Sequence, residues 1–122
     1  MQQPRTPATS ALYEAFKNSK SPAERDRFNF ADEEILREFT HWYIIKNRFP
    51  YDTMVRVNDL LVLKRPIAYR HEMSDSEAAE YQAIVEMLSH EGQYDAMIEN
   101  FPRVQSVKQH VHVHLVCWHA TS

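Results

Sequence analysis

Hydrophobic and polar positions alternate strictly near the C-terminal end of the chain, where residues 110–116 are His-Val-His-Val-His-Leu-Val. A period of two is typical of a β-strand that is buried on one face. Four earlier segments are rich in β-branched and aromatic residues, which also favour strands. The predicted strands cover residues 35–39, 41–46, 54–63, 94–100 and 107–118, with a reversal at Thr40 and a turn at 47–52.

One segment after the third of these strands has the period of a helix instead. The apolar positions of its core-facing stripe are Tyr81, Ile84, Val85 and Leu88. Ser74 and Glu77 precede the stripe with the spacing of a capping box, and Gly92 can end the helix in the left-handed conformation. Several strands and one long helix predict an α+β fold built on an antiparallel sheet.

The N-terminal third has weaker patterns. Residues 1–9 are rich in Pro, Gln and Thr and are expected to form a flexible tail. Ser10 can cap a short helix to about residue 18, and Pro22 suits the first turn of a second one. We therefore expect a single domain over residues 10–122, with a helical extension that reaches to about residue 30.

Composition excludes several classes of function. A chain of 122 residues with one glycine has no Walker A or dinucleotide-binding glycine motif. A net charge of -3 argues against binding to duplex nucleic acid. No apolar run approaches the length of a membrane span, and no secretory signal is visible. Because Cys117 is alone, no intrachain disulfide can form, and we expect a cytoplasmic protein.

The candidate chemistry lies in the alternating segment. In a strand, His110, His112 and His114 point to one face, with successive side chains roughly 6.5–7 Å apart, and the intervening residues point to the core. The exposed face of this strand would then be entirely imidazole. A simple interpretation is polar alternation on a solvated surface, although three histidines in register make this less attractive.

Two functional interpretations compete with that one. A metal site needs every ligand within about 2.1 Å of the ion, whereas three alternate positions spread over about 13 Å. At most two of these histidines could therefore bind one metal ion. The other interpretation is nucleophilic catalysis by the middle imidazole, because neutral imidazole attacks well and adjacent rings resist joint protonation.

The pattern of three histidines separated by apolar residues resembles the histidine-triad (HIT) nucleotide hydrolases and transferases. Other parts of the chain extend this resemblance in family order over about residues 35–116. They are Tyr43 to Tyr51 with an Asn-x-Phe-Pro turn, the strand Leu60 to Arg65, the helix entry Met73 to Glu77, and Asn100 followed by Gln105-Ser106-Val107.

The resemblance implies a five-stranded antiparallel sheet with a helix packed on it, and chemistry at the α-phosphate of a nucleotide. His112 matches the nucleophile that forms a covalent nucleotidyl-histidine, and His110 and His114 match its flanking partners. Ser106 matches the hydroxyl beside the phosphate and leaving group. The residues that match nucleotide-binding positions are Asn100, Gln105, Phe49 and Leu61. No metal or cofactor is required.

One departure from the family pattern concerns the site. Where the family usually has a fourth histidine, this chain has Asn58, so that role falls to Asn58 or is lost. Asn58 is accordingly counted with the nucleotide-binding residues. The resemblance implies a nucleoside phosphoramidate or a dinucleoside polyphosphate as substrate, and possible homodimers. Two alternatives stay open: a non-catalytic nucleotide-binding or interaction module of this fold, and a His-based metal-binding protein.

Overall fold

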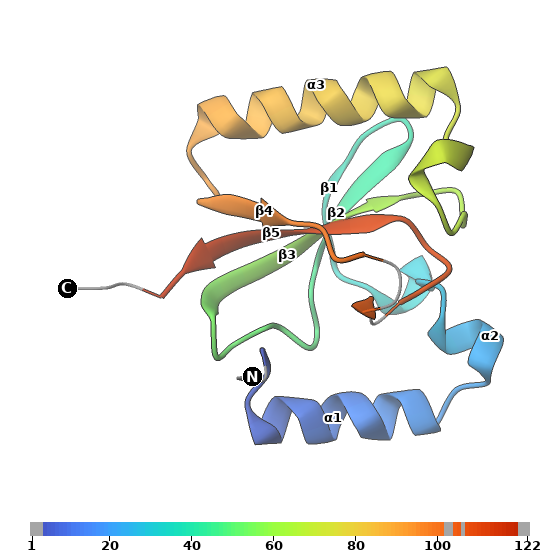
Figure 1. The fold of residues 1–122 in the computed structure, drawn as a ribbon, viewed down its shortest axis with the longest axis vertical. Helices are drawn as coiled ribbons and strands as arrows, with labels where there is room; N and C mark the ends of the chain where they lie inside the picture. The colour runs from blue at the N-terminus through green and yellow to red at the C-terminus, as the bar shows by residue number, and fades with distance from the viewer. Residues whose placement is uncertain (1–3, 102–103, 106, 120–122) are drawn as a thin grey trace.

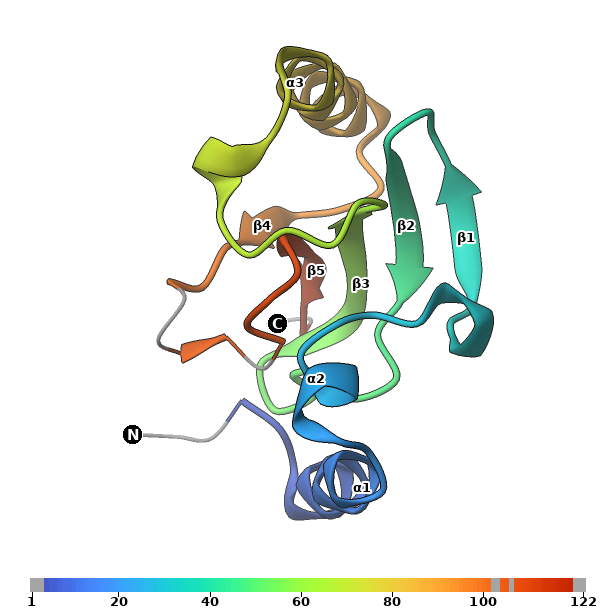
Figure 2. The same cartoon turned by 90° about the vertical axis from the view of Figure 1, so that its right-hand side faces the viewer.

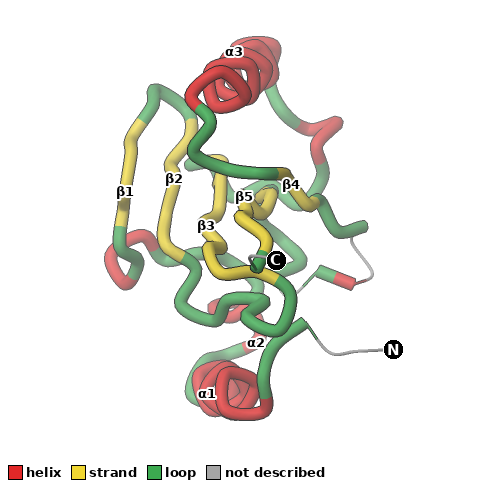
Figure 3. The backbone as a smooth tube through the Cα atoms, turned by 90° about the vertical axis from the view of Figure 1, so that its left-hand side faces the viewer, coloured by secondary structure: helices red, strands yellow, loops and turns green. Residues whose placement is uncertain are grey.

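The computed structural model describes residues 4–101, 104, 105 and 107–119, and its centre is an antiparallel sheet. The strands are β1 (Ile35–Glu38), β2 (Trp42–Lys46), β3 (Val55–Leu63), β4 (Ala96–Ile98) and β5 (His112–Trp118). They lie in the order β1-β2-β3-β5-β4, which can be followed from left to right in Figure 3. The predicted α+β class with a five-stranded sheet is confirmed.

Helices cover both faces of this sheet (Figure 1). Helix α3 (Asp75–Glu91) lies on one face, and α1 (Pro7–Asn18) and the short α2 (Pro22–Arg25) lie on the other. The short 3-10 helices η1 (Phe30–Asp32) and η2 (Arg70–Glu72) stand in the connections. None of the helices in the described part of the chain is long and apolar enough to cross a membrane.

Helix α3 begins and ends where the sequence pattern predicts. The Ser74 side chain accepts a hydrogen bond from the Glu77 backbone N–H, and the Glu77 carboxylate accepts one from the Ser74 N–H. The Glu77 carboxylate is buried and also receives two hydrogen bonds from Arg65, which hold its pKa at about 2. The capping box therefore also fixes the helix to the segment that follows β3.

The main core lies between α3 and the sheet. Its buried members come from all the long elements: Trp42, Ile44, Leu61, Leu63, Tyr81, Ile84, Leu88, Val111, Val113 and Leu115. Trp42 is completely buried, and its indole N–H donates to the Glu77 carbonyl over 3.0 Å. Val111, Val113 and Leu115 thus face this core, as the alternation predicts.

The strands that flank the candidate chemistry are shorter than predicted. Strand β5 begins at His112 and not at residue 107, because the Val111 N–H bonds to the Ile67 carbonyl in a loop and not to a strand. Strand β4 covers only three residues of the predicted seven. The register of the central pair is well defined, with Leu60 opposite His114 and Val62 opposite His112.

The first helix begins earlier than expected, at Pro7, with Thr6 as its N-cap in place of Ser10. The Asp52 carboxylate accepts hydrogen bonds from the Thr6 N–H and from the hydroxyls of Thr6 and Thr9. Residues 7–9, expected in a flexible tail, therefore belong to α1. These bonds tie the start of α1 to the turn between β2 and β3.

Gly92 provides a test of how α3 ends. Its φ is 70°, and a Cβ atom built at this position would meet nothing within 4 Å. A side chain at this position is therefore disfavoured by the positive φ and not by contacts with neighbouring atoms. We expect Gly92→Ala to lower the free energy of unfolding by about 1 kcal/mol in urea titrations. Gly92→Asn should lose less, because asparagine tolerates this conformation. An alanine variant as stable as the wild type would contradict the prediction.

Candidate functional site

The three histidines of β5 and its entry share one face of the sheet, as predicted, but this face is not exposed. His110, His112 and His114 are only 1%, 5% and 4% exposed. The expectation of a solvated imidazole face is therefore wrong. The N-terminal helices and the segment that joins α2 to β1 lie over these rings, and the covering layer can be followed in Figure 2.

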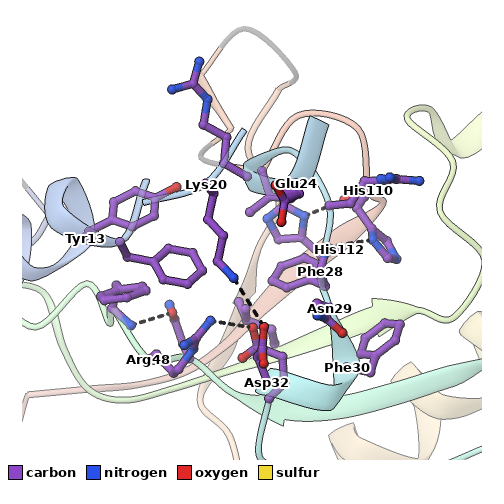
Figure 4. Close-up of a pocket in the computed structure, with 18 of the residues that line it drawn as sticks. Tyr13, Lys20, Glu24, Phe28, Asn29, Phe30, Asp32, Arg48, His110 and His112 are labelled. Atoms are coloured by element: carbon purple, nitrogen blue, oxygen red, sulfur yellow. Dashed lines mark hydrogen bonds and ion pairs between the residues drawn. The ribbon is translucent and has the colours of Figure 1, made fainter. Parts of the chain in front are cut away.

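Aromatic rings make the closest part of that cover. The ring of Phe28 lies edge-on to both His110 and His112, with centroids 5.2 Å apart in each case. Phe30 packs edge-on to His110 at 5.6 Å. Figure 4 shows Phe28 with the two histidines among the residues that line a pocket. Phe28 and Phe30 thus exclude water from the His110 end of the row.

His110 is bonded to the backbone at both ring nitrogens. Its Nδ1 accepts from the Phe28 N–H over 3.1 Å, and its Nε2 donates to the Leu63 carbonyl over 2.5 Å. Because one partner only donates and the other only accepts, the ring is neutral with its proton on Nε2. Burial lowers the pKa of His110 from 6.5 to about 4, against the effect of the Leu63 hydrogen bond. His110 has no ring nitrogen left for a substrate.

His112 is bonded at one nitrogen only. Its Nδ1 lies 2.7 Å from the His110 carbonyl, which can only accept, so Nδ1 carries the proton. No hydrogen bond joins Nε2 to any other residue of the described chain. Burial lowers the pKa of His112, although the His110 carbonyl and Glu99 oppose this. The neutral ring therefore has an available lone pair on Nε2.

His114 is held between a ring and an amide. The Tyr51 ring stacks on it, with centroids 4.3 Å apart and an interplanar angle of 23°. The Asn58 Nδ2 atom lies 3.0 Å from its Nδ1. Burial, with smaller effects of His112 and Arg5, lowers the pKa of His114 to about 3. The ring is therefore neutral, and Nε2 is the nitrogen that remains for other contacts.

A cavity of about 540 Å³ extends from the three histidines toward α1 and α2. Its wall includes the rings of Tyr13, Phe16 and Phe49. The ring centroids of Tyr13 and Phe16 lie 5.0 and 5.3 Å from that of Phe49. Charged residues also line it, and basic ones exceed acidic ones by six to three. They are Arg5, Lys20, Arg25, Arg27, Arg48 and Lys64, against Glu24, Asp32 and Glu33.

A smaller cavity of about 220 Å³ reaches His112 from the other side. It lies beyond the end of β4 and is lined by Arg70, Glu99, Asn100 and Gln105, among others. Arg70 and Glu99 form an ion pair of 2.9 Å within it. His112 thus lines two cavities, so its low exposure does not seal it from ligands.

Comparisons with known proteins bear on the fold. No protein-family model matches the sequence, and neither does any curated protein. One matching solved structure is described as a HIT family hydrolase from Clostridium thermocellum, Cth-393. The two chains are 18% identical, the match covers 92% of each, and the TM-score is 0.52. This chain has a HIT-like fold.

Within that fold, the residues predicted to bind the nucleotide do not all line the same cavity. Phe49 lines the large cavity, and Asn100 and Gln105 line the small one. The Asn100 amide donates to the Tyr51 hydroxyl over 2.9 Å, and the Gln105 amide donates to the Asn100 carbonyl over 3.1 Å. Ser106 lies outside the described residues.

Leu61 is not at the site. It is completely buried in the core under α3, on the opposite face of β3 from the histidines. Leu60 occupies the corresponding place on the histidine face, opposite His114, and lines the large cavity. The error is one residue in a strand, where neighbouring side chains point to opposite faces.

Asn58 is on the histidine face, but its side chain contacts the protein and not the cavity. Its carbonyl oxygen accepts hydrogen bonds from Asn47 and from the Tyr51 N–H. Its amide nitrogen bonds to the Asp59 carbonyl and to His114. All four hydrogen-bonding positions of the amide are occupied, so Asn58 has none to offer a nucleotide.

The sequence pattern did not indicate several residues that contact or line this site. Arg5 lies over the rings of Tyr13 and Tyr51, at 4.5 and 4.8 Å from their centroids. Tyr51 and Phe28 contact the histidines directly.

No group of three or more His, Cys, Asp and Glu residues that could hold a metal ion is found in the described part of the chain. His112 and His114 come within 5.8 Å, centroid to centroid, and the Nδ1 atom of each ring is bonded to a protein group.

The buried histidines should make the fold sensitive to acid. The pKa of His110 falls from 6.5 to about 4 on folding, so below pH 6.5 the unfolded chain binds this proton more readily than the folded one. Its stabilising contribution is complete above pH 6.5 and declines toward pH 4, by at most about 1.4 kcal/mol per pH unit. Urea titrations between pH 7 and 5 should therefore give a shallower pH dependence for His110→Asn than for the wild type. Equal slopes would contradict this account.

Proposed function

We propose that the protein hydrolyses or transfers a nucleotidyl group, acting at the α-phosphate of a nucleoside phosphoramidate or a dinucleoside polyphosphate. The observation that carries the proposal is the state of His112. Its Nδ1 donates to the His110 carbonyl, and its Nε2 lone pair is not used by the described residues. A neutral, oriented imidazole with an available nitrogen is a nucleophile at neutral pH.

The large cavity supports a nucleotide as the ligand. Its volume of about 540 Å³ is within the usual range for small-molecule sites, and it is lined by both aromatic and polar groups. The aromatic wall around Phe49 suits a flat base. The excess of basic residues around the cavity suits phosphate, although the whole chain carries a net charge of -3.

The proposed reaction has two displacements at phosphorus. In the first, the Nε2 lone pair of His112 attacks the α-phosphorus, and the bond to the leaving nitrogen or oxygen breaks with its electron pair. A phosphoramidate nitrogen takes up a proton from water as it leaves. In the second, water attacks the same phosphorus, the bond to Nε2 breaks with its electron pair returning to Nε2, and the attacking water releases its proton to solvent. One difficult displacement is thus divided into two easier ones.

The hydrogen bond from Nδ1 to the His110 carbonyl supports the intermediate. Once Nε2 bonds to phosphorus, the imidazole carries a positive charge, and a carbonyl at 2.7 Å stabilises it. Of the two flanking histidines, only His114 has a ring nitrogen left for the substrate. Asn100 and Gln105 would contact the phosphate from the smaller cavity. The family pattern assigns Ser106 the hydroxyl beside the phosphate and leaving group.

The nucleophile can be identified by trapping. On incubation with an adenosine phosphoramidate and rapid denaturation at alkaline pH, mass spectrometry should find an adenylyl group on the peptide that contains His112. His112→Ala should form no adduct and lose at least about 1,000-fold in kcat. His90→Ala, which changes an exposed histidine on the far side of the sheet, should behave as the wild type.

The non-catalytic alternative gives a different result in the same experiment. A binding module would form no adduct, release no nucleoside monophosphate, and keep its affinity for adenosine monophosphate when His112 is replaced by alanine. That combination would overturn the proposed reaction. An adduct on any other residue would overturn the assignment of the nucleophile.

A further inference from the structure

The Asn58 amide is enclosed by four partners, and two of them are backbone groups. Its Oδ1 atom lies 3.0 Å from the Tyr51 N–H and 3.1 Å from the Asn47 amide. Its Nδ2 atom lies 3.2 Å from the Asp59 carbonyl and 3.0 Å from Nδ1 of His114. The side chain is 5% exposed, so water does not replace these partners.

The two backbone groups determine which way the amide points. A backbone N–H can only donate, so the atom facing Tyr51 must be the oxygen. A carbonyl can only accept, so the atom facing Asp59 must be the nitrogen. The reversed amide would place two donors together at one end and two acceptors together at the other. Buried donors and acceptors that lose their partners destabilise a structure, so the reversed orientation is strongly disfavoured.

This orientation decides the state of the neighbouring imidazole. The Asn58 nitrogen is a donor, so Nδ1 of His114, 3.0 Å away, must be an acceptor without a proton. We propose that Asn58 is a positioning residue, which holds His114 as the neutral tautomer with its proton on Nε2. The family pattern implies a histidine at this place, whereas an amide has no proton to exchange.

The rest of the surroundings point the same way. Tyr51 covers one face of the ring, His112 lies edge-on to it, and Arg5 lies over the Tyr51 ring, 4.8 Å from its centroid. A proton on Nδ1 would lie against the N–H of the Asn58 amide, and a charged ring would be repelled by Arg5. The low pKa of His114, about 3, agrees with this arrangement.

The consequence for the reaction rests on the proposed function. A neutral His114 with a proton on Nε2 offers a fixed hydrogen bond toward the cavity, and it has no cationic proton to give. It would therefore stabilise charge on a phosphoryl oxygen or on the leaving atom. The proton that a leaving nitrogen takes up would then come from water in the cavity.

The tautomer can be observed without any substrate. In protein labelled with ¹⁵N at histidine, long-range ¹H–¹⁵N correlation at pH 7 distinguishes a protonated from an unprotonated ring nitrogen. The His114 signals are those that disappear in His114→Gln. We expect an unprotonated Nδ1 and a protonated Nε2. The opposite tautomer, an average of both, or a cationic ring in the wild type would each overturn the proposal.

A pair of variants tests whether Asn58 is the cause. Asn58→Asp replaces the donor by a carboxylate, which accepts from His114 and should move the proton to Nδ1. Asn47→Ala removes a different partner of the same amide but leaves both backbone groups, so the wild-type tautomer should persist. An unchanged His114 in folded Asn58→Asp would overturn the proposal. If that variant does not fold, the wild-type spectrum still decides the tautomer.

Kinetics separate positioning from a purely structural role. Asn58→Asp should lower kcat for an adenosine phosphoramidate by about 100-fold with KM nearly unchanged, because the lost donor acts in the transition state. An unchanged kcat with an inverted tautomer would overturn the positioning role. If the wild type does not hydrolyse the substrate, the proposed function fails, while the spectrum still tests the state of His114.

Discussion

Three neutral imidazoles lie in a row inside the protein, and protein groups form hydrogen bonds with four of their six ring nitrogens. The backbone of Phe28, Leu63 and His110 bonds the first two rings, and the Asn58 amide faces the third. Burial strongly disfavours charge on all of them. A buried ring must then be bonded or face a cavity, and only Nε2 of His112 and of His114 remain for the cavity. The proposed reactivity would thus depend on these two ring nitrogens, which the described residues leave without a hydrogen bond.

The cover over this row comes from a part of the chain far from β5 in sequence. Helix α1 packs on the turn between β2 and β3 through the Asp52 hydrogen bonds and through Phe49. Without this layer the histidine face would be exposed to solvent, and the burial that lowers the pKa values of the three imidazoles would be lost. The N-terminal segment therefore shapes the cavity and also sets the protonation of the rings. Its contribution is local electrostatics as much as packing.

The sequence pattern predicts much of the fold and the shared face of the three histidines. It does not predict the contacts between segments that are far apart in the sequence. Period and capping signals placed α3, Gly92 and the strands, because these depend on near neighbours in sequence. Alternation also put the three histidines on one face. It could not show what covers that face, because burial by α1 and Phe28 is a long-range contact. Leu61 was misplaced by a single position, since only the register with β5 shows that Leu60 faces His114.

Asn58 shows what a comparison of motifs cannot reveal. From the sequence alone, an asparagine at a position where the family usually has a histidine indicates that the role of this histidine is taken over or lost. In the structure, its orientation follows from two peptide groups, the Tyr51 N–H and the Asp59 carbonyl, which no side-chain pattern displays. A histidine could exchange protons with His114, but an amide can only hold one tautomer. The substitution therefore replaces a titratable contact by a fixed dipole, which suits a site whose rings are kept neutral by burial.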